Sequence, residues 1–349
     1  MKKQTKWLAA ALAALMLLSL AACGQSGKTP ASPSSIETQA PAPTAAPAPA
    51  ATEAPKPTEA PATPEPTPDT SVTVVDMTGR TVTLEEPAER IVALTASDCE
   101  ILFAIGAGDK LVGRGEYCDY PAEVLDIPSV QSGYDTNIEQ IIALQPQVLL
   151  MSTMAQTDEQ VKQLEDAGVH VVVSDAQDID GVYQAIRTIG ALMGKDENAE
   201  YVVKYMQEGF AELASKSAGG EEKTIYFEVS PLQWGLWTAG KGTFMNEVAE
   251  MLGLKNCFDD VDGWASISEE QVLERNPDYI MTITMYYGEG PTPEEEIMSR
   301  AGWENVTAVK NGAILNLQNN ELSRPAPRLL EGAQMLYDFV AANETELAA

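Results

Sequence analysis

The residues of this chain that could perform chemistry are chiefly carboxylates, since its 349 residues include one histidine and four cysteines. The histidine, His170, lies inside the apolar run Val169–Val173, which is typical of a strand rather than of a catalytic loop. No Gly-x-Ser-x-Gly, Walker A or Gly-x-Gly-x-x-Gly pattern accompanies it. One histidine cannot build a multi-histidine metal cage, and no calcium-loop pattern occurs. The sequence therefore predicts neither a nucleophilic catalytic centre nor a metal site.

Carboxylates alone leave one enzymatic alternative open. Glycoside hydrolysis needs only two of them, so a cell-surface hydrolase with a carboxylate acid and base is compatible with this composition, although no pair stands out. A structural or adhesive lipoprotein without a ligand site is another alternative.

With 52 acidic against 22 basic residues, the formal net charge is −30, which argues against nucleic acid and anionic lipid as partners.

The beginning of the chain has the organisation of an export signal. Lys2, Lys3 and Lys6 precede an apolar run over 7–20 that is too short to span a bilayer comfortably. Small residues then lead to Cys23, as in the lipobox of bacterial lipoproteins. We expect lipidation of Cys23 and loss of residues 1–22, because two acyl chains suffice to anchor the protein to the outer face of the cytoplasmic membrane.

The remaining cysteines, Cys99, Cys118 and Cys257, are odd in number and cannot all pair within one chain. A disulfide between Cys99 and Cys118 remains an alternative, while buried free thiols are favoured.

Residues 24–70 hold more than half of the 22 prolines and no aromatic residue. Such a segment cannot bury enough apolar surface to fold, so it is predicted to be an extended tether.

From residue 71 onward, apolar strands alternate with amphipathic helices, which predicts two α/β lobes with parallel sheets. The helical pattern over 196–216 is uninterrupted, with Tyr201, Tyr205, Phe210 and Leu213 assigned to its apolar face, and it separates the two lobes. The predicted strands are 72–75, 81–84, 90–94, 111–113, 148–151, 169–173, 224–229, 279–283 and 313–317. The other predicted helices are 98–105, 138–144, 158–167, 178–193, 243–252, 269–275 and 328–340. The predicted organisation is signal peptide 1–22, lipidated Cys23 and tether 23–70, first lobe 71–194, bridging helix 195–217, second lobe 218–343 and tail 344–349.

Several phrases, in order, resemble the periplasmic binding proteins for iron-siderophores, haem and cobalamin. They are Arg90–Thr95, Glu100–Asp109, Tyr117–Pro121, Asn137–Pro146, Gly240–Asn256, Ser268–Pro277 and Arg324–Arg328. The resemblance implies two Rossmann-like lobes joined by one long helix, with a ligand cleft between them and small lobe motions. It also implies a monomeric receptor, not an enzyme, that delivers a small molecule to an ABC permease and ATPase complex and carries no cofactor of its own.

The resemblance assigns transporter docking to Glu139 and Glu270, one on each lobe, where carboxylates could meet arginines of the permease. It also matches Trp264 and Arg324 to cleft residues of the family. A cation at a helix start would attract phosphate, carboxylate or catecholate. Aromatic side chains on loops after strands suit a flat amphipathic macrocycle. The predicted ligand contacts are Tyr117, Asp119, Tyr134, Trp264, Tyr286 and Arg324.

The phrase Cys118–Pro121 resembles the cobalamin-binding branch of the family, so a cobalt corrinoid is the favoured ligand. A ferric siderophore is the alternative, although siderophore receptors often present several arginines and this chain offers chiefly Arg324. Haem also stays open, with Tyr134, Met154, Met285 and Tyr286 as candidate axial ligands.

Overall fold

The computed structural model describes residues 70–133, 135–153, 157–217, 222–318 and 320–347. The predicted signal peptide, Cys23, nearly all of the predicted tether, Tyr134 and Met154 lie outside these residues. Contacts divide the chain into two units, Met1–Glu65 and Pro66–Ala349, and every described residue belongs to the second. No described helix is both long enough and apolar enough to cross a bilayer.

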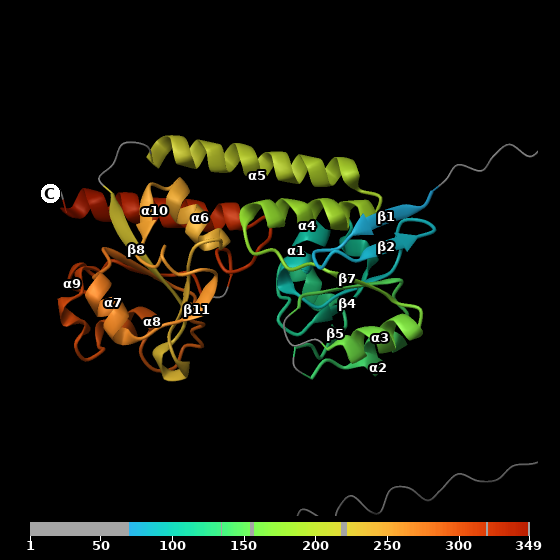
Figure 1. The fold of residues 1–349 in the computed structure, drawn as a ribbon, viewed down its shortest axis with the longest axis horizontal. Helices are drawn as coiled ribbons and strands as arrows, with labels where there is room; N and C mark the ends of the chain where they lie inside the picture. Colours follow the sequence, from blue (N-terminus) through green and yellow to red (C-terminus); the bar gives the residue numbers. More distant parts are fainter. Residues whose placement is uncertain (1–69, 134, 154–156, 218–221, 319, 348–349) are drawn as a thin grey trace, which may run out of the picture. The chain divides into compact units, whose positions relative to one another are not determined.

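The first lobe is built on a sheet that is parallel, as predicted, and has five strands in the order β5-β4-β3-β6-β7, of which β5 was not predicted (Figure 1). Its strands are β3 (Ile91–Ala93), β4 (Leu111–Gly115), β5 (Ser129–Val130), β6 (Val148–Met151) and β7 (His170–Val173). Its helices are α1 (Ala96–Ala104), α2 (Ile138–Ala143), α3 (Asp158–Asp166) and α4 (Ile179–Leu192), with short 3₁₀ turns η1 (Gly108–Lys110) and η2 (Ala122–Asp126). An antiparallel hairpin of β1 (Val72–Val75) and β2 (Thr81–Leu84) precedes this sheet.

The second lobe contains a six-stranded mixed sheet with the order β11-β9-β8-β12-β13, in which β10 pairs with the start of β8. Its strands are β8 (Lys223–Ser230), β9 (Trp237–Ala239), β10 (Leu254–Asn256), β11 (Trp264–Ser266), β12 (Tyr279–Thr282) and β13 (Ile314–Asn316). Its helices are α6 (Phe244–Met251), α7 (Glu269–Arg275), α8 (Pro293–Met298), α9 (Thr307–Asn311) and α10 (Leu329–Leu347), with η3 (Leu232–Trp234) and η4 (Trp303–Asn305). Strands β9 and β11 pair antiparallel at one edge and were not predicted.

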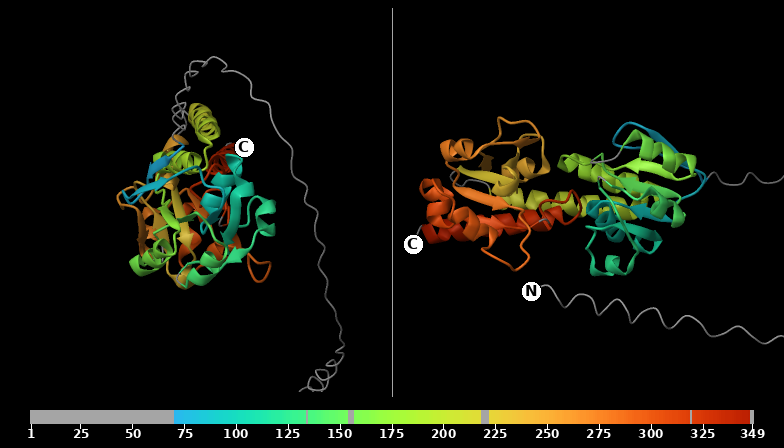
Figure 2. Two further views of the ribbon diagram at one scale, coloured as in Figure 1. Left: turned by 90° about the vertical axis from the view of Figure 1, so that its right-hand side faces the viewer. Right: turned by 90° about the horizontal axis from the view of Figure 1, so that it is seen from below.

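One long helix, α5 (Asp196–Ser217), connects the lobes and packs on α4 of the first lobe and on α6 and α10 of the second (Figure 1). The arrangement of two lobes is also visible from below (Figure 2). The buried face of α5 consists of Ala199, Val202, Val203, Met206, Phe210 and Leu213. The assignment of Tyr201 and Tyr205 to this face is wrong, since they are 74% and 58% exposed. Residues four apart lie on the same side of a helix, so the spacing of these two tyrosines does not tell which side is buried. The side of α5 that packs on the lobes is the one that carries Val202, Val203 and Met206.

A single apolar cluster runs through both lobes beneath α5, containing Ile91 of β3, Phe210 of α5 and Ile225 of β8. Two smaller clusters lie inside the individual lobes, around Leu149 in the first and around Trp303 in the second. The lobes are therefore joined by shared apolar packing as well as by chain connectivity, which limits how far they can move apart.

Helix α10 continues to Leu347, so the predicted tail from residue 344 is helical through Leu347. Residues 341–347 contain neither Gly nor Pro, and nothing in them stops the helix.

Cys99, Cys118 and Cys257 are buried free thiols, as the sequence favoured.

Candidate functional site

The carboxyl ends of the first-lobe strands lie at one edge of their sheet, as they must in a parallel sheet, and the loop after β4 at this edge carries the predicted ligand residues Tyr117 and Asp119. Strand β4 ends at Gly115, where an added Cβ would lie 2.1 Å from the Leu94 carbonyl oxygen. Only glycine permits this approach, which brings the following loop close to the end of β3. Tyr117 on that loop is 73% exposed. Its ring is available to a ligand or partner.

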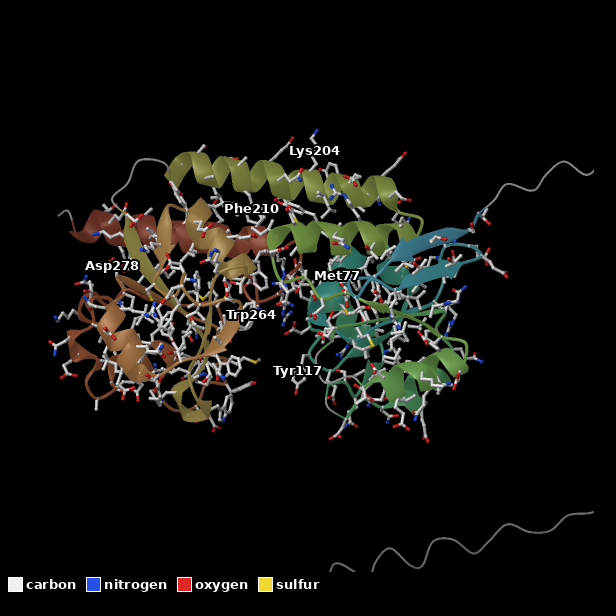
Figure 3. All side chains as sticks on the ribbon, viewed as in Figure 1. Met77, Tyr117, Lys204, Phe210, Trp264 and Asp278 are labelled. Carbon is white, nitrogen blue, oxygen red and sulfur yellow. The ribbon has the colours of Figure 1, made fainter. Side chains whose placement is uncertain are left out.

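Trp264 begins the edge strand β11 rather than lying on a loop, which corrects the sequence interpretation. Its half-buried indole packs on the ring of Phe244, with centroids 5.4 Å apart, and its Nε1 donates a 2.8 Å hydrogen bond to Oε1 of Gln177. Gln177 follows β7 in the first lobe, so this bond links the lobes. Figure 3 shows Trp264 and Tyr117 on the inner sides of the two lobes.

Two further hydrogen bonds fasten the segment after β7 to α6. The Phe244 N–H donates to the Gln177 carbonyl, and the Ile179 N–H donates to Oε2 of Glu247, both at 2.8 Å. Burial raises the pKa of Glu247, and neighbouring Asp178 adds to the effect, while the bond from Ile179 opposes it. This polar joint holds Trp264 at a defined place between the lobes.

Arg324, which the sequence places ahead of a helix start as a ligand contact, is 8% exposed and therefore a buried cation. Its Nη1 lies 2.6 Å from Oδ1 of Asp119 and 3.1 Å from Oε1 of Glu100. Burying a guanidinium requires carboxylate partners, and both of these come from the first lobe. The two predicted ligand residues Arg324 and Asp119 are thus brought together, but as partners of each other.

Glu100, with a side chain only 2% exposed, is the centre of a second set of polar contacts between the lobes, which we call the second polar joint. Besides Arg324 it accepts two hydrogen bonds from Arg328, at 2.7 and 3.0 Å. The Arg328 guanidinium lies 3.7 Å from the centroid of the Tyr120 ring and also pairs with Glu321. The joint fastens the start of α10 to α1 and to the loop after β4.

Tyr286 lies on the loop after β12 and lines a cavity of about 430 Å³ in the second lobe. Its hydroxyl donates to the Gly290 carbonyl at 3.2 Å. The other residues lining this cavity include Leu232, Gln233, Met285, Tyr287 and Glu296. Glu296 also pairs with Arg300 at 2.6 Å, and Arg300 makes a buried bidentate pair with Glu228. This pair anchors α8, which forms part of the cavity wall.

Asp98 is a buried acid that the sequence analysis did not single out. Its Oδ2 accepts a hydrogen bond from the Thr95 hydroxyl, and among the described residues its Oδ1 has no hydrogen-bond partner. Burial raises the pKa of Asp98 to about 6. The spacing Thr95-x-x-Asp98 resembles a capping box and could have identified this carboxylate from the sequence.

Glu139 and Glu270 occupy the same position in two helices, one on each lobe. Each is the second residue after a capping side chain, Asn137 for α2 and Ser268 for α7, and both glutamates are exposed. Hydrogen bonds from its own backbone N–H and from Ser268 lower the pKa of Glu270. Both carboxylates are therefore held in solvent at helix starts, where a cationic partner can reach them.

A metal site is not evident in the part of the chain that the structure describes, where no group of three or more His, Cys, Asp or Glu residues could hold an ion. His170 begins β7 and is exposed.

Comparison with known proteins identifies the family. Residues 91–321 match the family model described as Periplasmic binding protein. The chain is 34% identical over 275 residues to the uncharacterized ABC transporter substrate-binding lipoprotein YvrC of Bacillus subtilis, covering 77% of this chain and 85% of that protein. It is 28% identical over 253 residues to the vitamin B12-binding protein of Salmonella choleraesuis, covering 71% and 89% of the two chains.

Among solved structures, a possible iron-binding (periplasmic solute-binding) protein from Staphylococcus epidermidis superposes with a TM-score of 0.62 at 32% identity. The match covers 73% of this chain and 99% of that one. These relatives are transport components rather than enzymes, so the hydrolase alternative is set aside. The chain belongs to the periplasmic binding protein family and is the substrate-binding component of an ABC importer.

Proposed function

We propose that this protein captures a bulky, metal-containing small molecule between its lobes, with a cobalt corrinoid favoured, and delivers it to the permease and ATPase complex. The observation that carries the proposal is the position of Trp264. Its indole comes from the second lobe and is fixed by Gln177 of the first, which sets a large aromatic surface between the lobes. Such a surface suits a flat macrocycle.

Two further features support a corrinoid. Tyr117 supplies an exposed aromatic ring from the opposite lobe. The positive charge of Arg324 is balanced by Glu100 and Asp119, so this side chain does not offer an open cation to a strongly anionic iron complex. A curated relative carries the name vitamin B12-binding protein, which agrees with this choice.

The test is a titration of the purified chain with cyanocobalamin, haemin and a ferric hydroxamate, followed by calorimetry and absorption spectroscopy. We expect a one-to-one complex with the corrinoid and a shifted spectrum. Trp264→Ala should weaken it by about tenfold or more, because an aromatic contact and its burial contribute more than about 1.4 kcal/mol. Tyr201→Ala, which removes an exposed ring from α5, is the matched control. If the ferric hydroxamate or haemin binds and calorimetry detects no heat of binding for the corrinoid, the choice of a corrinoid as ligand is overturned.

Haem is a second candidate ligand, favoured by one observation. Met285 and Tyr286 line the second-lobe cavity of about 430 Å³, where a thioether and a phenol could serve as axial ligands. A Soret shift on adding haemin that disappears in Met285→Ala or Tyr286→Phe would favour this candidate. An unchanged spectrum would remove it.

Membrane attachment and docking complete the proposal. Cys23 is proposed to carry the lipid anchor, and the protein is proposed to act as a monomer on the outer face of the cytoplasmic membrane. Glu139 and Glu270 are proposed to contact arginines of the permease, one from each lobe. Their support is the matching position at the starts of α2 and α7 and their exposure to solvent. Metabolic labelling with a radioactive fatty acid, lost in Cys23→Ser, tests the anchor.

A further inference from the structure

Two neighbouring cavities open beside α5 and share Tyr205 and Glu331. The larger, of about 620 Å³, lies between α5 and α10. The smaller, of about 400 Å³, lies where α1, the loop after Tyr120, α5 and the start of α10 meet. None of the predicted ligand residues that the structure describes lines either cavity. We call this continuous feature the α5–α10 groove.

The floor of the groove is apolar and is made by close helix packing. Gly209 of α5 faces Leu330 of α10, and an added Cβ at Gly209 would lie 2.4 Å from a Leu330 methyl carbon. Glycine inside a helix costs about 1 kcal/mol relative to alanine, and here the close approach of the two helices requires it. Tyr205 and Met335 rise beside this floor and are 58% and 44% exposed. Apolar surface is therefore left open to a partner.

The rim of the groove is acidic. Glu208 and Glu212 come from α5, and Glu331 comes from α10. Lys204 and Lys216 pair with Glu208 and Glu212 at 3.7 and 2.7 Å, but both are exposed i,i+4 pairs of little energetic weight that a partner can replace. Glu331 makes no ion pair within the described ranges. Arg328, the cation in the lining, is already engaged by Glu100 and Glu321.

We propose that the α5–α10 groove binds a cationic amphipathic helix of another envelope protein, at a surface that the predicted ligand residues in the described ranges do not line. An amphipathic helix would lay its apolar face against Leu330, Met335 and Tyr205, and its Lys or Arg residues would meet the acidic rim. A second copy of this chain is disfavoured by its net charge of −30. The chain's own segment 24–69 also carries more acidic than basic residues, so it lacks the complementary charge.

The probe is a labelled synthetic helix with Leu at i, i+3, i+4 and i+7 positions and Lys elsewhere, added to the full chain with Cys23→Ser. Fluorescence anisotropy at about 0.15 M salt measures binding where long-range charge effects are screened. Tyr205→Ala removes the apolar contact, with Tyr201→Ala on the same helix as its control. Glu331→Lys reverses a rim charge, with Glu304→Lys, an exposed acid outside the groove, as its control.

We expect Tyr205→Ala and Glu331→Lys each to weaken the peptide complex by about tenfold, the equivalent of about 1.4 kcal/mol. Both controls should stay within about twofold, and a Glu-for-Lys peptide should not bind. If the control variants weaken peptide binding as much as the groove variants do, the attraction is general and the proposal is overturned. Absence of peptide binding to the parent protein would also overturn it. Dimerisation of the chain alone that Tyr205→Ala abolishes would assign the groove to a second copy and also overturn it. Because Tyr205 is exposed, its variant should fold, and its unfolding curve checks this.

Discussion

The indole Nε1 of Trp264 donates a 2.8 Å hydrogen bond to Oε1 of Gln177, and this bond crosses from the edge strand of the second lobe to the first. Together with the pairing of Asp119 and Arg324 at 2.6 Å, it shows that polar side chains join the lobes at two separate places. Shared apolar packing under α5 adds a third connection. The relative position of the lobes is thus set by several independent contacts, each of which can be tested.

The Trp264–Gln177 bond should contribute measurable stability. Trp264→Phe keeps an aromatic ring against Phe244 but loses the donor, and Gln177→Ala loses the acceptor. We expect each change to lower the free energy of unfolding by about 0.5–1.5 kcal/mol for the lost bond. In urea denaturation, a double-mutant cycle should show that the two effects are not additive. Trp234→Phe, at an exposed position, is the control, and additive effects would contradict the assigned bond.

Removal of the Glu100 carboxylate should be among the most damaging single changes in the protein. Glu100→Gln leaves the buried guanidinium groups of Arg324 and Arg328 without their shared partner. We expect a loss of about 3–5 kcal/mol in the free energy of unfolding. Glu123→Gln, a change at an exposed acid nearby, should stay within about 0.5 kcal/mol. A similar small change for Glu100→Gln, measured in urea, would show that the joint is not energetically important.

Asp98 should make stability depend on pH. Burial raises its pKa in the folded protein to about 6, whereas an unfolded aspartate titrates near 3.9. The folded state therefore binds this proton more tightly, and ionisation penalises the fold above about pH 6. The penalty, of about 3 kcal/mol, should disappear as the pH falls through 6 toward about 4.

The measurement is urea unfolding of the parent protein and Asp98→Asn across this range. An asparagine oxygen can still accept the bond from Thr95 and is never charged. The variant should therefore be the more stable near neutral pH, and its advantage should fade with acidification. An advantage that is constant with pH would contradict the raised pKa.

Glu139 and Glu270 should act in delivery and not in capture. Glu139→Arg and Glu270→Arg place a like charge against the proposed arginines, and we expect each to reduce ligand-dependent stimulation of the permease ATPase in vesicles by about tenfold or more. Binding of cyanocobalamin to the isolated variants should not change. Glu159→Arg on α3 is the control. Normal stimulation of both docking variants would refute the assigned role.

The three thiols of the folded region should be unreactive in the native protein. Cys99, Cys118 and Cys257 are buried and free, and burial raises the pKa of Cys257 to about 12. In a Cys23→Ser variant, a disulfide-exchange reagent should detect no thiol before denaturation and all three afterwards. Detection of only one thiol in the denatured protein would instead reveal a bridge between two of them.

Local signals in the sequence were sufficient for much of the fold. The predicted limits of β1, β2, β6 and α7 agree with the structure, because β2 alternates in burial, β6 is a continuous apolar run and α7 begins at a capping box. The missed elements were short, including β5, β9, β10 and β11 at three residues or fewer. A capping box at Thr292, with Pro293 at the first helical position, would have located α8.

The sequence by itself determined the class of protein, the two lobes and the long helix between them. It could not determine that Arg324 is neutralised by Asp119 and Glu100, that Trp264 is bonded to Gln177, or that Tyr205 faces outward. Periodicity and capping act over a few residues and are therefore readable locally. Burial and ion pairing between the lobes join residues far apart in the chain, so only the packed tertiary structure decided them.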